Sequence, residues 1–139
     1  MRRSAILGLL ALWALAGCGW AGANPHTTKP DGFLLHGYVS VPGPSSGTAG
    51  AACASAKPDI HSGTDVKVTD DGGKALASGV LGDGVLAASG SGYRCNFPFE
   101  ISNVSSSATT VVVLVGLQPA AKFSTRPLTE GQPAVIPVS

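Results

Sequence analysis

Few side chains in this chain of 139 residues could perform acid–base, nucleophilic or metal chemistry. The three histidines, His26, His36 and His61, show neither the i, i+4 spacing of a helical zinc site nor the H-x-H spacing of a strand site. A zinc or copper site would require His36 and His61 to meet in the folded protein. We expect instead that His36 lies at the surface or core edge of a strand, so the histidines predict no metal site.

The carboxylates and serines also lack the spacing of known reactive sites. The turn-like run Asp70-Asp71-Gly72-Gly73 has no alternating ligands and no distal Glu, so it predicts a solvated turn and not a calcium loop. Ser91 is flanked by glycines but lacks the G-x-S-x-G spacing of a nucleophile elbow. Glu100 and Glu130, the only glutamates, lie beside predicted strands or turns. We expect no catalytic residues, no metal and no cofactor.

The first seventeen residues have the three-part order of an export signal. Met1-Arg2-Arg3 is positively charged, residues 5–15 are almost wholly apolar, and Ala16-Gly17 are small. This order predicts a signal peptide over residues 1–17. A transmembrane helix is the alternative, but a bilayer core needs roughly 20 apolar residues, and glycines interrupt this run well before that length.

Leu15-Ala16-Gly17-Cys18 resembles the lipobox of bacterial lipoproteins at all four positions. The resemblance implies cleavage before Cys18, diacylglycerol on its thiol and acylation of the new amino terminus. Two or three acyl chains anchor a protein durably, so the expected partner is the membrane and the expected location is its extracytoplasmic face. Ordinary secretion is the alternative, because Ala21-Gly22-Ala23 offers a general signal peptidase site that would start the mature chain at Asn24.

Cys53 and Cys95 remain as an even pair once Cys18 carries lipid. In an exported and therefore oxidising compartment they predict a disulfide. A redox site is the alternative, but there is no C-x-x-C spacing. Closing a loop of about 43 residues would stabilise the fold by about 4 kcal/mol in the chain-entropy description.

Composition indicates one small domain with an almost neutral surface. Charged residues make up 12% of the chain, and removal of Arg2 and Arg3 leaves seven Lys and Arg against eight Asp and Glu. Nucleic acid and a polybasic membrane contact both require clustered Lys and Arg, so neither kind of partner is expected. The 19 Gly and 10 Pro indicate turns and loops in place of helices.

Beyond the signal peptide, residues 18–32 lack an apolar period and predict a flexible tether, with Trp20 suited to the lipid headgroup region. Alternating and β-preferring residues then predict about seven short strands and no helix over residues 33–139. The strand segments are 33–41, 65–69, 75–81, a weak one at 85–87, 94–101, 109–117, 122–126 and 134–138. The Ser/Gly/Ala-rich residues 45–56 predict a loop that Cys53 holds in place.

Two of these strands have distinct burial patterns. Residues 94–101 alternate, with Cys95, Phe97, Phe99 and Ile101 on one face, which predicts a half-buried strand. Pro98 within it lacks an N–H group, which predicts an edge strand or a bulge. The run TTVVVLVGL at 109–117 predicts a central strand buried on both faces.

These elements predict an all-β fold, an antiparallel Greek-key sandwich of about seven strands. The pattern Val66-x-Val68-x-Asp70-x-x-Gly73, with the Cys95-x-Phe97-x-Phe99-x-Ile101 strand, resembles small exported actinobacterial proteins of uncharacterised function. Its first part is also similar to prealbumin-like and carboxypeptidase-regulatory-like sandwich domains. That similarity implies a Greek-key topology and no catalytic residues.

Three functional hypotheses follow. The first is a non-catalytic, lipid-anchored cell-envelope protein that acts as a binding or structural module for an envelope protein or another envelope component. The second is a secreted, non-lipidated sandwich that carries a small apolar ligand. The third is a metal-binding or hydrolytic enzyme that relies on His36 and His61.

Overall fold

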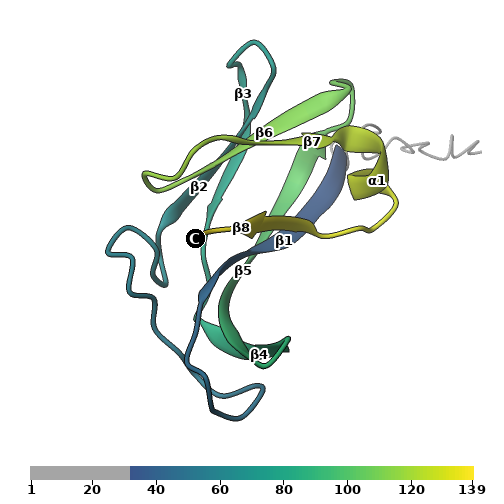
Figure 1. Cartoon of the computed structure of the whole chain (residues 1–139). Helices are drawn as coiled ribbons and strands as arrows, with labels where there is room; N and C mark the ends of the chain where they lie inside the picture. Colours follow the sequence, from purple (N-terminus) through teal and green to yellow (C-terminus); the bar gives the residue numbers. More distant parts are fainter. Residues whose placement is uncertain (1–31) are drawn as a thin grey trace, which may run out of the picture.

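The computed structural model describes residues 32–139, and these residues form strands almost throughout (Figure 1). The elements are β1 (Gly32–Pro42), β2 (Asp65–Asp70), β3 (Ala75–Val80), β4 (Val85–Ser89), β5 (Gly92–Ser105), β6 (Thr110–Val115), β7 (Ala121–Ser124), α1 (Thr125–Thr129) and β8 (Ala134–Pro137). The all-β expectation is confirmed. No helix within these residues is long and apolar enough to cross a bilayer.

The strands form two four-stranded sheets around one hydrophobic core. Sheet A has the order β4-β5-β1-β8, and sheet B has the order β3-β2-β6-β7. The chain passes from one sheet to the other between β1 and β2, β3 and β4, β5 and β6, and β7 and β8. The two sheets therefore enclose the core as in a sandwich.

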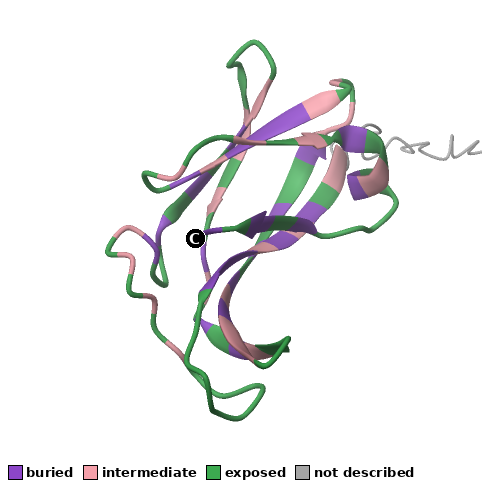
Figure 2. Ribbon diagram, in the orientation of Figure 1, coloured by how far each residue is buried: buried purple, intermediate pink, exposed green. Residues whose placement is uncertain are grey.

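The core is built from the alternating residues of both sheets, as Figure 2 shows by the change of burial along each strand. Val66 and Val68 of β2 are fully buried, and every second residue of β5 from Cys95 to Ile101 is at most 3% exposed. The predicted hairpin of β2 and β3 and the predicted half-buried strand β5 are confirmed. The 2-residue period of apolar side chains thus places one face of each sheet in the core.

Pro98 does not lie on an edge strand, because β5 has β4 on one side and β1 on the other. Within β5, however, Pro98 lies beyond the last residue that β4 reaches, which is Asn96, opposite Val85. The Pro98 carbonyl accepts a hydrogen bond from the backbone N–H of Gly82 at 2.7 Å, so its backbone faces away from β1. The missing N–H group consequently interrupts no ladder, which explains why proline is tolerated in an inner strand.

The end of sheet B differs from the expected pattern in two places. The predicted strand 122–126 ends at Ser124, and a short helix α1 follows, with Pro127 in its first turn. Proline is accommodated there because the first N–H groups of a helix have no intrahelical partner. The central strand β6 is confirmed, but Leu117 lies in the turn after it and is 89% exposed.

Sheet A is not wholly antiparallel, because β8 pairs with β1 in parallel. The register runs from Gly37 opposite Ala134 to Ser40 opposite Pro137. A Cβ atom on Gly37 would overlap the Ala134 carbonyl, so the close approach of the two strands depends on this glycine. Residues 32–139 therefore form eight strands, with β8 parallel to β1, where the sequence predicts about seven antiparallel strands.

Candidate functional site

The disulfide between Cys53 and Cys95 joins the long segment before β2 to the inner strand β5. Its Cα atoms are 5.9 Å apart and its sulfur atoms 2.01 Å apart. Cys95 is fully buried, so the bond ties the segment to the core. The predicted disulfide, and the prediction that Cys53 holds this loop, are both confirmed.

The disulfide segment, residues 43–64, also covers the free side of β4. The N–H of Gly50 donates to the Leu86 carbonyl at 2.9 Å, and the Leu86 N–H donates to the Ala51 carbonyl at 2.8 Å. The Cys53 N–H donates to the Gly84 carbonyl at 3.1 Å. The segment thus runs along β4, with one isolated antiparallel bridge between Ala52 and Val85, and β4 does not present an open edge there.

An apolar cleft of about 390 Å³ lies beside the disulfide. Its lining combines buried core residues, Ile60 and Phe97, with polar residues that include Lys57, His61 and Asp83. The complete lining is Ala52, Cys53, Ala54, Ser55, Lys57, Pro58, Ile60, His61, Ser62, Asp83, Gly84 and Phe97. The sequence did not predict this cleft, because its lining combines the disulfide segment with Asp83, Gly84 and Phe97, which are distant from that segment in sequence.

A second cleft of about 580 Å³, which we call the polar cleft for its charged and polar lining residues, shares His61 with the apolar cleft. Its lining is Asp59, His61, Gly63, Thr64, Asp65, Lys67, Leu114, Gly116 and Leu117. Most of these residues are exposed, so the cleft is open to solvent. Its lining includes two carboxylates, a lysine and His61, but no hydrogen-bonded pair of these described side chains is found that would suit acid–base or nucleophilic chemistry.

Asp59 holds the wall of the polar cleft together. One carboxylate oxygen, Oδ2, accepts hydrogen bonds from the Gln118 side chain and from the Leu117 N–H, each at 2.9 Å. These donors lower the pKa of the Asp59 carboxyl below its ordinary value of 3.8, the Gln118 side chain contributing most. Asp59 therefore joins the disulfide segment to the turn after β6 and acts as a structural carboxylate.

The two described histidines do not form a metal centre. His36 Nε2 is 2.8 Å from the Gly131 carbonyl, while His61 Nδ1 is 2.9 Å from the Ser62 carbonyl. His36 lies opposite Glu100 in the β1–β5 ladder, whereas His61 belongs to the disulfide segment. Within residues 32–139 no group of three or more His, Cys, Asp or Glu could hold a metal ion.

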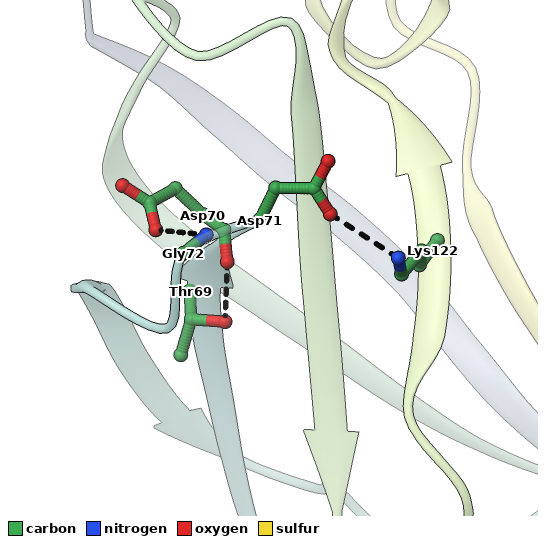
Figure 3. A network of polar contacts seen from close by, with 5 residues as sticks. All are labelled: Thr69, Asp70, Asp71, Gly72 and Lys122. Carbon is green, nitrogen blue, oxygen red and sulfur yellow. Dashed lines mark hydrogen bonds and ion pairs between the residues drawn. The ribbon is translucent and has the colours of Figure 1, made fainter.

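The Asp70-Asp71-Gly72-Gly73 run forms the solvated turn that the sequence predicts. Asp70 Oδ1 accepts hydrogen bonds from the N–H groups of Gly72 and Lys74, both at 2.9 Å. The neighbouring Asp71 forms an exposed ion pair with Lys122 of β7 at 3.3 Å, across the start of β6 (Figure 3). The first carboxylate therefore closes the hairpin, and the second joins it to the far strand of sheet B.

The remaining sequence candidates lie on separate elements. Ser91 is in the turn between β4 and β5, and Glu100 is exposed on β5. Glu130 follows α1 and pairs with Arg126 at 3.4 Å. The signal peptide, Cys18, the tether, Trp20 and His26 lie outside the described residues. No two of the described candidates form a pair suited to acid–base or nucleophilic chemistry.

Comparison of the chain with protein-family models, with curated proteins and with solved structures found no match. The function proposed for the protein therefore depends on its sequence and on the geometry of the described domain.

Proposed function

We propose that this protein is a non-catalytic, lipid-anchored cell-envelope module that binds or supports another envelope component. The observation that carries the proposal is Leu15-Ala16-Gly17-Cys18 at the end of a charged and then apolar leader. The Cys53–Cys95 disulfide supports it, because such bonds persist mainly in oxidising, exported compartments.

The arrangement of the domain supports a binding role away from the membrane. The chain enters the domain at Gly32, which pairs with Ser105 at one end of sheet A. The start of β2 and the turn after β6 lie toward the other end of the strands (Figure 1). The polar cleft is lined by these two places, and the apolar cleft shares His61 with it. The thirteen residues from Gly19 to Asp31 have a reach of at most about 45 Å. In an anchored protein the polar cleft would thus lie away from the end of the domain at which the tether enters.

The finer fold that we propose is a Greek-key, prealbumin-like sandwich. Two observations support it. The chain passes four times between the sheets, and the inner strands of the two sheets are β5, β1, β2 and β6. Such a topology presents loops at both ends of a rigid core, and loops of this kind commonly carry binding residues.

Intact mass measurement of the full-length gene product, expressed in a bacterial host, tests the anchor. We expect envelope-associated protein that starts at Cys18 and carries diacylglycerol and a further acyl chain. A Cys18→Ala variant should lose the lipid mass and the envelope attachment. An unmodified chain that starts at Asn24 and is found in the medium would contradict the proposal.

A second candidate function, secreted carriage of a small apolar ligand, is favoured only by the apolar cleft. Its volume of about 390 Å³ is within the usual range of ligand sites. Core residues such as Leu35, Val39 and Val66 are fully inaccessible to solvent, so a ligand would have to bind in the cleft and not between the sheets. Titration with the apolar dye anilinonaphthalene sulfonate tests this, because Ala54→Arg should weaken binding at the cleft. A native domain that does not bind the dye would remove this candidate.

A further inference from the structure

One edge of the sandwich is open, and it belongs to β3. The edge strands of the two sheets are β4, β8, β3 and β7. The disulfide segment covers β4, β8 is four residues long and ends in Pro137, and β7 is four residues long and carries Lys122. Prolines, charges and short length are the usual protection of an edge. The six residues of β3, ALASGV, have neither a charge nor a proline, and in the described part of the chain they pair with β2 alone.

The hydrogen bonds of the β2–β3 ladder show which β3 groups point outward. The Leu81 N–H donates to the Thr64 carbonyl at 2.9 Å, so Leu81 faces β2. Along an antiparallel strand, the backbone N–H and C=O groups of successive residues point alternately toward and away from the neighbouring strand. Since the groups of Leu81 point toward β2, those of Val80 and Ser78 point away from it. The edge is limited at one end by the irregular pairing near Leu76. It is limited at the other end by Gly82, whose N–H group donates to the Pro98 carbonyl of sheet A. The open part of the edge is therefore centred on Gly79.

The side chains around this edge are exposed and of opposite charge at its two ends. Val80 is 54% exposed, and Ser78 is exposed beside it. Lys74 precedes β3 and Asp83 follows it, and both are exposed. Neither takes part in the two ion pairs found within residues 32–139. A second β3 strand laid antiparallel to the first would bring each lysine near the partner's aspartate.

We propose that β3 of one molecule pairs antiparallel with β3 of a second copy, about a two-fold axis at Gly79. Ser78 then lies opposite Val80 of the second copy, and the two symmetric pairs supply four backbone hydrogen bonds. At each end Lys74 lies beside Asp83 of the second copy. The interface is isologous, since the same residues contribute from both copies, and it joins the two sheets B into one eight-stranded sheet. The contact is small, so the dimer is weak.

Native mass spectrometry and sedimentation equilibrium of the full-length gene product, in detergent if it carries lipid, test the proposal. We expect a concentration-dependent dimer. Lys74→Glu and Asp83→Lys should each raise the dimer Kd about tenfold, because each places like charges at both ends of the interface. The double variant K74E/D83K should restore the Kd, because the two charges exchange places and opposite charges again meet at each end of the interface.

Two further variants test whether the dimer contact lies on β3. Val80→Lys should abolish the dimer by placing a charge on the open edge. Arg126→Gln, far from β3 on α1, should leave the Kd unchanged, and thermal unfolding of all variants should show that the fold is retained. A monomer at every concentration would overturn the proposal. So would a dimer that is insensitive to the Lys74, Val80 and Asp83 variants, or failure of the double variant to recover. The result does not depend on whether Cys18 is lipidated.

Discussion

Arg94 and Ser40 are bound side chain to side chain, with Arg94 Nε donating to Ser40 Oγ at 2.8 Å. The Arg94 Nη2 group also donates to the Ser40 and Val138 carbonyls, each at 2.7 Å. One guanidinium thereby joins β5, β1 and the residue that follows β8. The partners lie 54 and 44 residues away in sequence, so no local pattern indicated this role.

Replacing this guanidinium should weaken the fold. We expect Arg94→Ala to lower the free energy of unfolding by about 2 kcal/mol, because three charge-assisted hydrogen bonds are lost and two backbone carbonyls lose a donor. Urea denaturation measures the change. Arg126→Ala is the control, since its side chain is 90% exposed, and its effect should be within about 0.5 kcal/mol. Equal effects of the two variants would show that the Arg94 contacts add nothing.

The disulfide should contribute more than any single hydrogen bond. Cys53 and Cys95 are 42 residues apart, and closing such a loop stabilises the folded state by about 4 kcal/mol in the chain-entropy description. We expect the double variant C53A/C95A to lose about this amount in urea denaturation. Reducing agent should destabilise the wild-type protein similarly and leave the variant unaffected. A wild-type protein whose unfolding midpoint does not move on reduction would refute this expectation.

Parallel pairing of β1 with β8 should depend on Gly37. A Cβ atom there would overlap the Ala134 carbonyl, so Gly37→Ala must push the strands apart, and we expect a loss of about 3 kcal/mol. Gly92→Ala in β5 is the matched control, because its Cβ would meet nothing closer than the Pro44 carbonyl at 3.5 Å. Thermal unfolding of the two variants compares them directly. Similar unfolding temperatures would indicate that β8 contributes little to stability.

Acid should weaken the contact between the disulfide segment and the turn after β6. The pKa of Asp59 is lowered in the folded protein, so its contribution is present above the unfolded value of 3.8 and is lost as pH falls through the folded-state pKa. We therefore expect Asp59→Asn to be less stable than wild type at neutral pH, and the gap to narrow below about pH 4. Thermal unfolding between about pH 7 and pH 2.5 measures the gap. A gap that is constant with pH would exclude this role.

Gln118 gives an independent check, because its side chain is the largest cause of the lowered Asp59 pKa. Gln118→Ala should move the pKa of that carboxyl back toward its ordinary value, leaving the Leu117 N–H as a remaining donor. Carbon-detected NMR titration of the carboxyl reports the change. An unaltered titration would show that the Gln118 hydrogen bond is not formed in solution.

Much of the fold could be predicted because local patterns determine it. Alternation identified β2 and β5, turn residues identified the hairpin, and the pairing of Cys53 with Cys95 was expected because the sequence predicts export to an oxidising compartment. The direction of β8 could not be predicted, because four residues of strand pattern fit a parallel or an antiparallel neighbour equally well. The helix α1 was missed because its five residues are too few for an apolar period.

The candidate site was less predictable than the fold. Residues 45–56 contain mainly small side chains, which indicated only a loop, yet their backbone pairs with β4 and the segment borders the apolar cleft. The role of Asp59 depends on Leu117 and Gln118, 58 and 59 residues away in sequence. Contacts of this range arise from the sandwich as a whole, so no sequence window contains both partners.

The parallel pairing of β1 with β8 also sets when the described domain can be completed during synthesis. β1 is made before the other described strands, whereas one of its two neighbours, β8, is made after them, and His36 is hydrogen-bonded to the carbonyl of Gly131, 95 residues later in the chain. Contacts between distant residues slow folding, because the intervening chain must be closed into a loop first. Until β8 leaves the ribosome, β1 has an unpaired side. Premature termination near residue 130 would therefore leave an exposed edge on sheet A and a chain prone to aggregate.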